Sequence, residues 1–249
     1  MRLAAVLLLA AGTATADDRR STYEDMTPDL QALQDDPFAN PGLLTALEGE
    51  ALWSDPAGPE GVSCADCHGA VEEAMAGVAA RYPAWDATAG RPVDLDGRIE
   101  ECRTDRQDAA PLGRESPELL ALSMLVTLQS KGDPIAPPDG PGMSVWRDRG
   151  EALFRAELGQ LDLSCADCHE ANPGGRLLAA TIPEAHPTGY PQYRLEWEET
   201  GSLQRRFDNC LFGVRSDPFP HGSDAYLALE VWLKARAAGM PMEAPAVRP

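Results

Sequence analysis

The sequence is poor in aromatic residues, in basic residues and in long apolar runs. Phe, Trp and Tyr make up only 6% of its 249 residues, and 21 Lys and Arg stand against 40 Asp and Glu, for a net charge of −19. This excess of acid makes nucleic acid and anionic membranes poor partners. No stretch approaches the roughly 18 uninterrupted apolar residues of a transmembrane helix. Hydrophobic residues still amount to 43%, which is enough for one or two globular cores.

The N-terminus has the pattern of an export signal. Arg2 supplies the positive charge, residues 3–11 form a short apolar run, and residues 14–16 are the small residues of a cleavage site. We therefore expect cleavage after Ala16 and a periplasmic mature protein. Residues 17–40 are predicted to form an extended N-terminal arm.

The cysteines follow a spacing that is typical of c-type haem attachment. Four of the six lie in two identical Cys-Ala-Asp-Cys-His strings, at residues 64–68 and 165–169. Two thiols spaced in this way bond to the two vinyl groups of one haem, and the adjacent His reaches the iron. The alternatives, zinc or a redox-active pair, are weaker, because zinc needs four ligands and the two pairs lie 101 residues apart. The residues predicted to hold two covalent haem c groups are Cys64, Cys67, His68, Cys165, Cys168 and His169.

Each motif lies inside a longer internal repeat with an offset of 101 to 108 residues. The matched pieces are 49–53 with 150–154, 82–85 with 190–193, and Cys102 with Cys210. Each copy ends in a helix with one apolar stripe, followed by a glycine, Gly132 or Gly239. Each half therefore follows the order helix, haem motif, long loop, cysteine, helix. We predict a mainly α fold of two tandem cytochrome c-like domains with one haem each.

The predicted domain boundaries follow from the repeat and from a seam rich in Pro and Gly. Residues 132–142 contain four prolines and three glycines, which cannot continue a helix. The first domain is expected at 41–131 and the second, which contains Cys210, at 143–249.

The second axial ligand of each iron is predicted from the repeat. Cys102 and Cys210 are the only residues with metal-ligand chemistry at equivalent places in both halves. A thiolate ligand stabilises ferric iron and lowers the reduction potential. The alternative for these two residues is a Cys102–Cys210 disulfide. Other chemically possible ligands are His186, His221, Met124, Met143 and Met240.

Arginines gather around only one of these two cysteines. Arg206 lies one helical turn before Cys210 and is the best candidate for binding an anionic substrate there. Arg236 is a weaker candidate, and Arg205 could point toward the site or away from it. The alternative is that these arginines hold haem propionates or pair with surface carboxylates.

The block from Tyr193 to Cys210, the two haem motifs and the final helix resemble the SoxA family, the dihaem subunits of the SoxAX cytochromes of bacterial thiosulfate oxidation. The resemblance covers nearly the whole mature chain. It implies L-cysteine S-thiosulfotransferase activity, in which thiosulfate is joined oxidatively to a cysteine of the carrier SoxYZ and two electrons are released. It also implies a monohaem partner, SoxX, and a position equivalent to Cys210 that is often a persulfide.

With the resemblance, Cys210 is expected to carry the sulfur chemistry, Arg206 and Arg236 to position the anion, and the haems to transfer electrons. No general base is identified. A competing interpretation is a dihaem cytochrome that only shuttles electrons. A third is a dihaem peroxidase, which needs an open or displaceable position at one iron, whereas this sequence offers a strong ligand to each.

Overall fold

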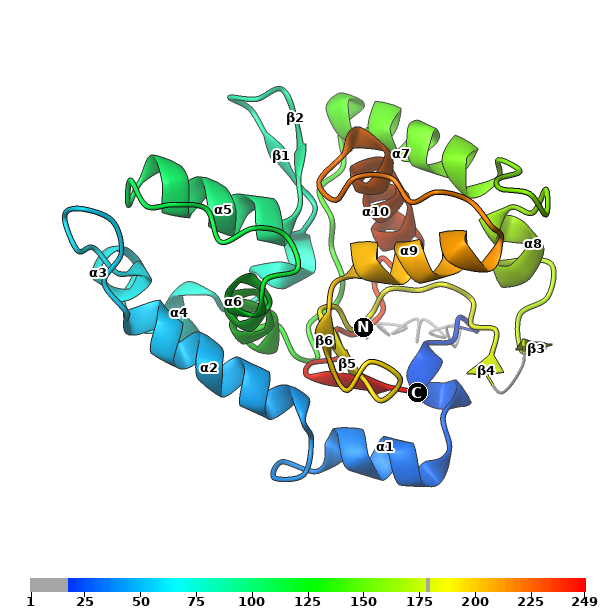
Figure 1. Ribbon diagram of the computed structural model, residues 1–249, viewed down its shortest axis with the longest axis horizontal. Helices are drawn as coiled ribbons and strands as arrows, with labels where there is room; N and C mark the ends of the chain where they lie inside the picture. The colour runs from blue at the N-terminus through cyan, green and yellow to red at the C-terminus, as the bar shows by residue number, and fades with distance from the viewer. Residues whose placement is uncertain (1–17, 178–179) are drawn as a thin grey trace, which may run out of the picture.

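The computed structural model describes residues 18–177 and 180–249, so the predicted export signal lies outside the described residues. The described part is mainly helical and has short strands between the helices (Figure 1). Its helices are α1 (Pro28–Asp35), α2 (Gly42–Ser54), α3 (Cys64–His68), α4 (Val71–Ala74), α5 (Leu95–Asp105), α6 (Pro117–Leu128), α7 (Pro141–Phe154), α8 (Cys165–His169), α9 (Leu203–Gly213) and α10 (Asp224–Arg236). Its strands are β1 (Ala84–Asp86), β2 (Arg91–Val93), β3 (Arg176–Leu177), β4 (Ala180–Thr181), β5 (Gln192–Arg194), β6 (Glu199–Gly201) and β7 (Ala246–Arg248). Short 3-10 turns lie at Thr22–Asp25 and Ala79–Arg81.

Two helix pairs of the same design form the cores. α2 packs along α6 on one side of the molecule, and α7 packs along α10 on the other (Figure 1). Glycine permits each close crossing, because a Cβ on Gly49 would lie 2.3 Å from the carbonyl oxygen of Ala121, and one on Gly150 would lie 2.0 Å from that of Ala228. The same close helix contact therefore occurs in both copies of the repeat. Leu125 in one core and Phe154 in the other are almost fully buried.

A short hairpin leads into each helix that carries a lone cysteine. β1 pairs with β2, and β5 pairs with β6 in the same antiparallel register. The following helices, α5 and α9, begin at equivalent N-caps: Asp94 accepts a hydrogen bond from the Gly97 amide at 2.9 Å, and Ser202 accepts one from the Arg205 amide at 3.1 Å. Capping satisfies amide groups that have no partner within the helix. Cys102 and Cys210 thus take the same position in two equivalent hairpin–helix units.

The two halves also exchange contacts. β2 lies against α7 and α10 of the other half, and β6 lies against α6. The C-terminal strand β7 adds to β5 in parallel and completes a three-stranded sheet. Hairpins that cross over in this way bring the beginnings of α5 and α9 close to one another.

Three segments differ from the sequence predictions. Residues 18–40 are not extended throughout, because they contain α1, and they are held to the C-terminus by hydrogen bonds such as Asn40 Nδ2 to the Pro245 carbonyl at 2.9 Å. α7 begins at Pro141, inside the predicted seam. Gly132 and Gly239 have the left-handed φ of a capping residue but lie past the cap positions, which Gln129 and Ala237 occupy.

None of the helices in the described ranges combines the length and the apolar character required to cross a membrane.

Candidate active site

Each Cys-Ala-Asp-Cys-His string forms a five-residue helix that is fixed by a capping box. In α8, Ser164 Oγ accepts a hydrogen bond from the Asp167 amide at 3.2 Å, and the Asp167 carboxylate accepts one from the Ser164 amide at 2.8 Å. Ser63 and Asp66 do the same in α3. A helix this short is not stable on its own, so the reciprocal caps are what hold the two thiols on one turn.

The motif histidines lie beside aromatic side chains of the preceding helices. The ring centres of His169 and Phe154 are 6.4 Å apart, and those of His68 and Trp53 are 5.7 Å apart. His169 Nδ1 lies 2.7 Å from the Pro183 carbonyl oxygen, which can only accept, so Nδ1 carries the proton. This hydrogen bond fixes the ring and leaves Nε2 for a second partner, the arrangement expected of a metal-ligating histidine.

The lone cysteines lie next to the haem motifs. In addition to burial, the nearby Cys102 raises the pKa of Cys64. Cys210 likewise adds to the effect of burial in raising the pKa of Cys165 and of Cys168. All six cysteines are free thiols, so the alternative of a Cys102–Cys210 disulfide does not occur. Each half therefore brings together two attachment thiols, one imidazole and a further thiol from another helix, a donor set that fits a c-type haem.

The other chemically possible ligands have different partners. His186 is buried, with Nδ1 2.9 Å from the Arg20 carbonyl oxygen, and His221 Nε2 lies 2.7 Å from Asp208. Met124, Met143 and Met240 are buried among apolar residues.

The electrostatic environments of the two cysteines are opposite. Burial raises the pKa of Cys102. The positive charge of Arg98 acts to lower this pKa, but the negative charge of Glu101 acts to raise it. At Cys210 burial also acts to raise the pKa, but Arg206, His169 and Arg194 outweigh it, so the pKa of the thiol is lowered. A lowered thiol pKa favours the thiolate, which is both the nucleophile and the iron ligand.

The difference begins with the arginine one turn before each cysteine. Arg98 is neutralised by Asp86 and Glu101, each at 2.9 Å. Arg206 holds the equivalent position in α9, and within residues 18–177 and 180–249 its side chain forms no ion pair. A mostly buried guanidinium without a paired carboxylate, in a protein of strongly negative charge, is available to an anion.

The remaining candidate arginines contact aromatic rings and carboxylates. Arg205 pairs with Glu199 at 2.5 Å and lies over the Trp197 ring at 4.4 Å. Arg236 lies over the Phe154 ring at 5.1 Å, with Nη2 3.7 Å from Glu170. The structure thus brings Arg206 to Cys210 along α9, and it places Arg236 against Phe154, whose ring lies beside His169 of the α8 motif.

Two further residues lie near Cys210: Arg194, which the sequence places among the arginines around Cys210 without a role of its own, and Tyr190, which the sequence does not indicate as a site residue. Arg194 and Tyr190 precede α9, and both interact electrostatically with Arg206 and Cys210. The signal that could have found them is the repeat, since at the offset of 108 they correspond to Asp86 and Tyr82.

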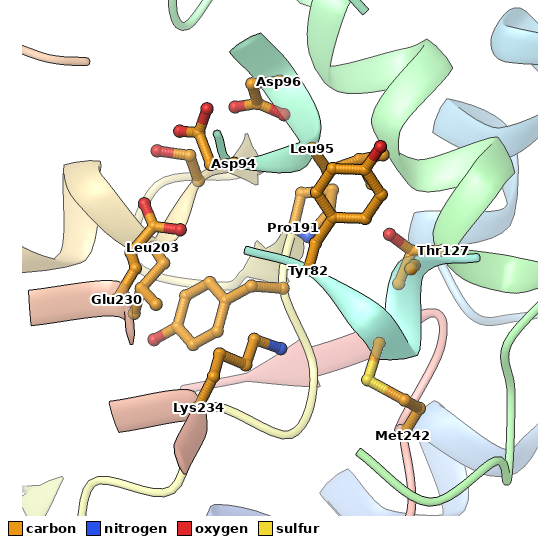
Figure 2. A pocket seen from close by; sticks show the side chains of 13 residues that line it. Tyr82, Asp94, Leu95, Asp96, Thr127, Pro191, Leu203, Glu230, Lys234 and Met242 are labelled. Carbon is orange, nitrogen blue, oxygen red and sulfur yellow. The ribbon is translucent and has the colours of Figure 1, made fainter. Parts of the chain in front are cut away.

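A second polar site lies between the two halves. A cavity of about 60 Å³ is lined by Asp94 and Asp96 at the start of α5, by Thr127 of α6 and by Glu230 and Lys234 of α10 (Figure 2). Burial raises the pKa of Asp96 to about 7 and that of Glu230 to about 8.

One side chain joins the two cysteine-bearing helices at this cavity. The Gln204 amide donates hydrogen bonds to Asp94 at 3.0 Å and to Glu230 at 2.7 Å. Because Asp94 caps α5 and Gln204 lies in the first turn of α9, the contact fixes the two helices relative to each other.

Comparison with known proteins first identifies the class of fold. Residues 48–135 match the family model of the SoxA/TsdA cytochrome c domain, which confirms the cytochrome c class of the fold.

The particular family follows from relatives that cover most of the chain. The SoxA subunit of L-cysteine S-thiosulfotransferase from Rhodovulum sulfidophilum is 37% identical over 93% of this chain and 81% of that protein. The SoxA subunit from Pseudaminobacter salicylatoxidans is 35% identical over 86% and 75%. The crystal structure of SoxXA from P. pantotrophus matches with a TM-score of 0.89 and 31% identity, over 93% of this chain and 87% of that one. The chain belongs to the SoxA family of L-cysteine S-thiosulfotransferase subunits, as the sequence motifs indicated.

Proposed function

We propose that this protein joins thiosulfate to a cysteine of a SoxYZ-type carrier protein and passes two electrons to a SoxX-type c cytochrome. The overall reaction converts thiosulfate and a carrier thiol into a carrier S-thiosulfonate, one proton and two electrons. The observation that carries the proposal is the half-buried Cys210 thiol, which shares α9 with Arg206 and lies near His169 of the second motif.

Two haem c groups are part of this proposal, one in each of two cytochrome c-like units. Cys64 and Cys67 would attach the first and Cys165 and Cys168 the second, and the residues that would hold the iron are His68 and Cys102 in one unit and His169 and Cys210 in the other. When bound, these groups supply one-electron transfer and a polarising metal for the cysteine sulfur.

The residues of the chain divide the remaining work. Arg206 would hold the sulfonate end of thiosulfate, which leaves the outer sulfur directed at the Cys210 sulfur. Oxidative joining of these two sulfurs gives a Cys210 S-thiosulfonate and two electrons. A carrier thiolate then attacks the sulfur adjacent to Cys210, takes the SSO₃ group and releases the Cys210 thiolate.

The named partners are supported by the relatives. The matching crystal structure from P. pantotrophus is described as SoxXA, which supports a SoxX-type partner subunit here. A carrier cysteine and thiosulfate are consistent with the L-cysteine S-thiosulfotransferase name of the SoxA relatives. Export to the periplasm follows from the N-terminal signal pattern and from the cytochrome c class.

The test is reconstituted turnover of the haem-loaded protein with its partner cytochrome, a carrier thiol and thiosulfate. We expect one S-thiosulfonate, detected as an added mass on the carrier, for every two haems reduced. Haem reduction by other donors without any thiosulfonate would contradict the proposal and favour the electron shuttle.

A further inference from the structure

The two cysteine centres are built on the same scaffold but carry inverted charges. Asp86 ends β1 and Arg194 ends β5, and each occupies the same register position of its hairpin, opposite Arg91 and Glu199 respectively. The offset of 108 that relates these strands also relates Arg98 to Arg206 and Glu101 to Asn209. The contacts of the first half therefore show what each second-half residue replaces.

In the first half this scaffold neutralises its own arginine. Arg98 donates to the Asp86 carboxylate at 2.9 Å and pairs with Glu101, also at 2.9 Å. One guanidinium thus faces two carboxylates beside Cys102. A further anion would be repelled from this position.

In the second half the same positions leave an excess of positive charge. Arg194 replaces the Asp86 carboxylate with a second guanidinium, and Asn209 replaces the Glu101 carboxylate with a neutral amide. Burial lowers the pKa of Arg194, and the like charge of Arg206 nearby lowers it further. Both charges also act on Cys210.

The Arg194 side chain is fixed in place, yet one of its donors is unused. Arg194 is only 9% exposed, its guanidinium lies 5.0 Å from the centre of the Trp197 ring, and Nη2 donates to Glu196 at 2.7 Å. Its Nε is buried and has no hydrogen-bond partner. The Glu196 side chain is 58% exposed, so solvent weakens its attraction to the two arginines.

Two neighbouring buried guanidinium groups are unfavourable unless an anion lies between them, and a buried donor without a partner costs free energy as well. We propose that Arg194 and Arg206 together form the binding site for the thiosulfate dianion at Cys210, with Arg194 as a second substrate-binding residue. This rests on the proposed function. At the equivalent position near Cys102, the Asp86 carboxylate would repel the same dianion.

The shared chemistry is an oxyanion between two guanidinium groups, and a haem propionate is the other source of such an anion. The test therefore measures thiosulfate binding and haem properties separately. Binding is titrated by calorimetry on the oxidised, haem-loaded complex without carrier, for wild type, Arg194→Gln, Arg194→Lys and Arg194→Asp. Arg205→Gln is the matched control, because Arg205 stacks on the same Trp197 ring but is paired with Glu199.

We expect Arg194→Gln to weaken thiosulfate binding by about tenfold or more, on the scale of a charge-assisted hydrogen bond. Arg194→Lys should recover part of the loss, Arg194→Asp should weaken binding further because it restores the pairing of the first half, and Arg205→Gln should bind as wild type does. Unchanged thiosulfate affinity in Arg194→Gln would overturn the proposal. A shifted haem midpoint potential with unchanged affinity would assign Arg194 to a propionate instead.

The test of the anion site and the test of the proposed reaction can fail independently. Weakened thiosulfate binding in a protein that forms no S-thiosulfonate would uphold the anion site and reject the reaction. Normal binding by Arg194→Gln in a protein that turns over would uphold the reaction and reject the role of Arg194.

Discussion

Cys210 occupies the position in α9 that Cys102 occupies in α5, and the pKa of the two thiols is shifted in opposite directions. Both lie the same number of residues after a hairpin of the same register. Because the backbones are equivalent, the difference arises from the charged side chains around each thiol. Duplication thus supplied two cysteine centres, and substitution of a few charges distinguishes them.

Arg206→Gln tests whether the arginine beside Cys210 binds substrate. We expect the KM for thiosulfate to rise about tenfold to a hundredfold, because a charged donor to the anion is lost. Arg98→Gln is the matched control at the equivalent position of α5, and it should leave the KM for thiosulfate unchanged. Steady-state kinetics at constant ionic strength measure both, and equal effects of the two substitutions would contradict this assignment.

Gly150→Ala tests the close crossing of α7 and α10. The added Cβ would lie 2.0 Å from the Ala228 carbonyl oxygen, so the helices must separate, and we expect a loss of about 1–3 kcal/mol in the free energy of unfolding. In Gly213→Ala the new methyl group meets no atom within 4 Å, so this control should be neutral or slightly stabilising. Chemical denaturation of the haem-loaded proteins measures both, and a neutral Gly150→Ala would show that the crossing is not tight.

Asp96→Asn tests the protonated carboxyl at the cavity between the halves. Burial and the charge of Asp94 raise the pKa of Asp96 to about 7, whereas an unfolded aspartate titrates near about 4. Between these values the folded state holds a proton that the unfolded state has released, so this group makes the protein less stable as pH rises.

Asparagine does not titrate, and we therefore expect Asp96→Asn to gain stability relative to wild type between about pH 4 and pH 7. Its hydroxyl partner Ser123 remains available to the amide. Urea unfolding across this range measures the difference, with Asp55→Asn on the exposed surface as control. A constant difference between wild type and Asp96→Asn would show that Asp96 is ionised in the folded protein.

Ser164→Ala tests the capping box of the second haem motif. The substitution removes the acceptor for the Asp167 amide, and we expect a loss of about 1 kcal/mol in the free energy of unfolding. Ser216→Ala, whose hydroxyl bonds only to the adjacent Asp217 carbonyl, should have little effect. Thermal melts of the two variants side by side provide the comparison, and equal melting temperatures would remove the capping argument.

The repeat could be detected in the sequence where its residues are identical or nearly so. Identical residues occur in the two CADCH strings, where haem chemistry requires them, and at Gly49 and Gly150, where close helix packing requires them. The strands could not be predicted in this way. β2 is three residues long and contains Pro92, and β7 pairs with a strand far away in the sequence.

The proximity of Arg206 and Cys210 could be predicted from the sequence because the two residues share one helix. Arg194 lies on a strand before that helix, and its proximity to Cys210 depends on how β5 packs. The position of Arg236 depends on which face of α10 meets Phe154, and helical spacing alone does not determine that.

The most direct test of this account compares Cys210→Ala with Cys102→Ala in haem-loaded protein paired with its partner cytochrome. Mass spectrometry of the carrier after one turnover reports S-thiosulfonate formation, and haem spectra confirm that both variants retain their haems. We predict that Cys102→Ala forms product and that Cys210→Ala forms none. Product formation by Cys210→Ala, or its loss in both variants with all haems retained, would contradict the assignment of the chemistry to the second centre alone.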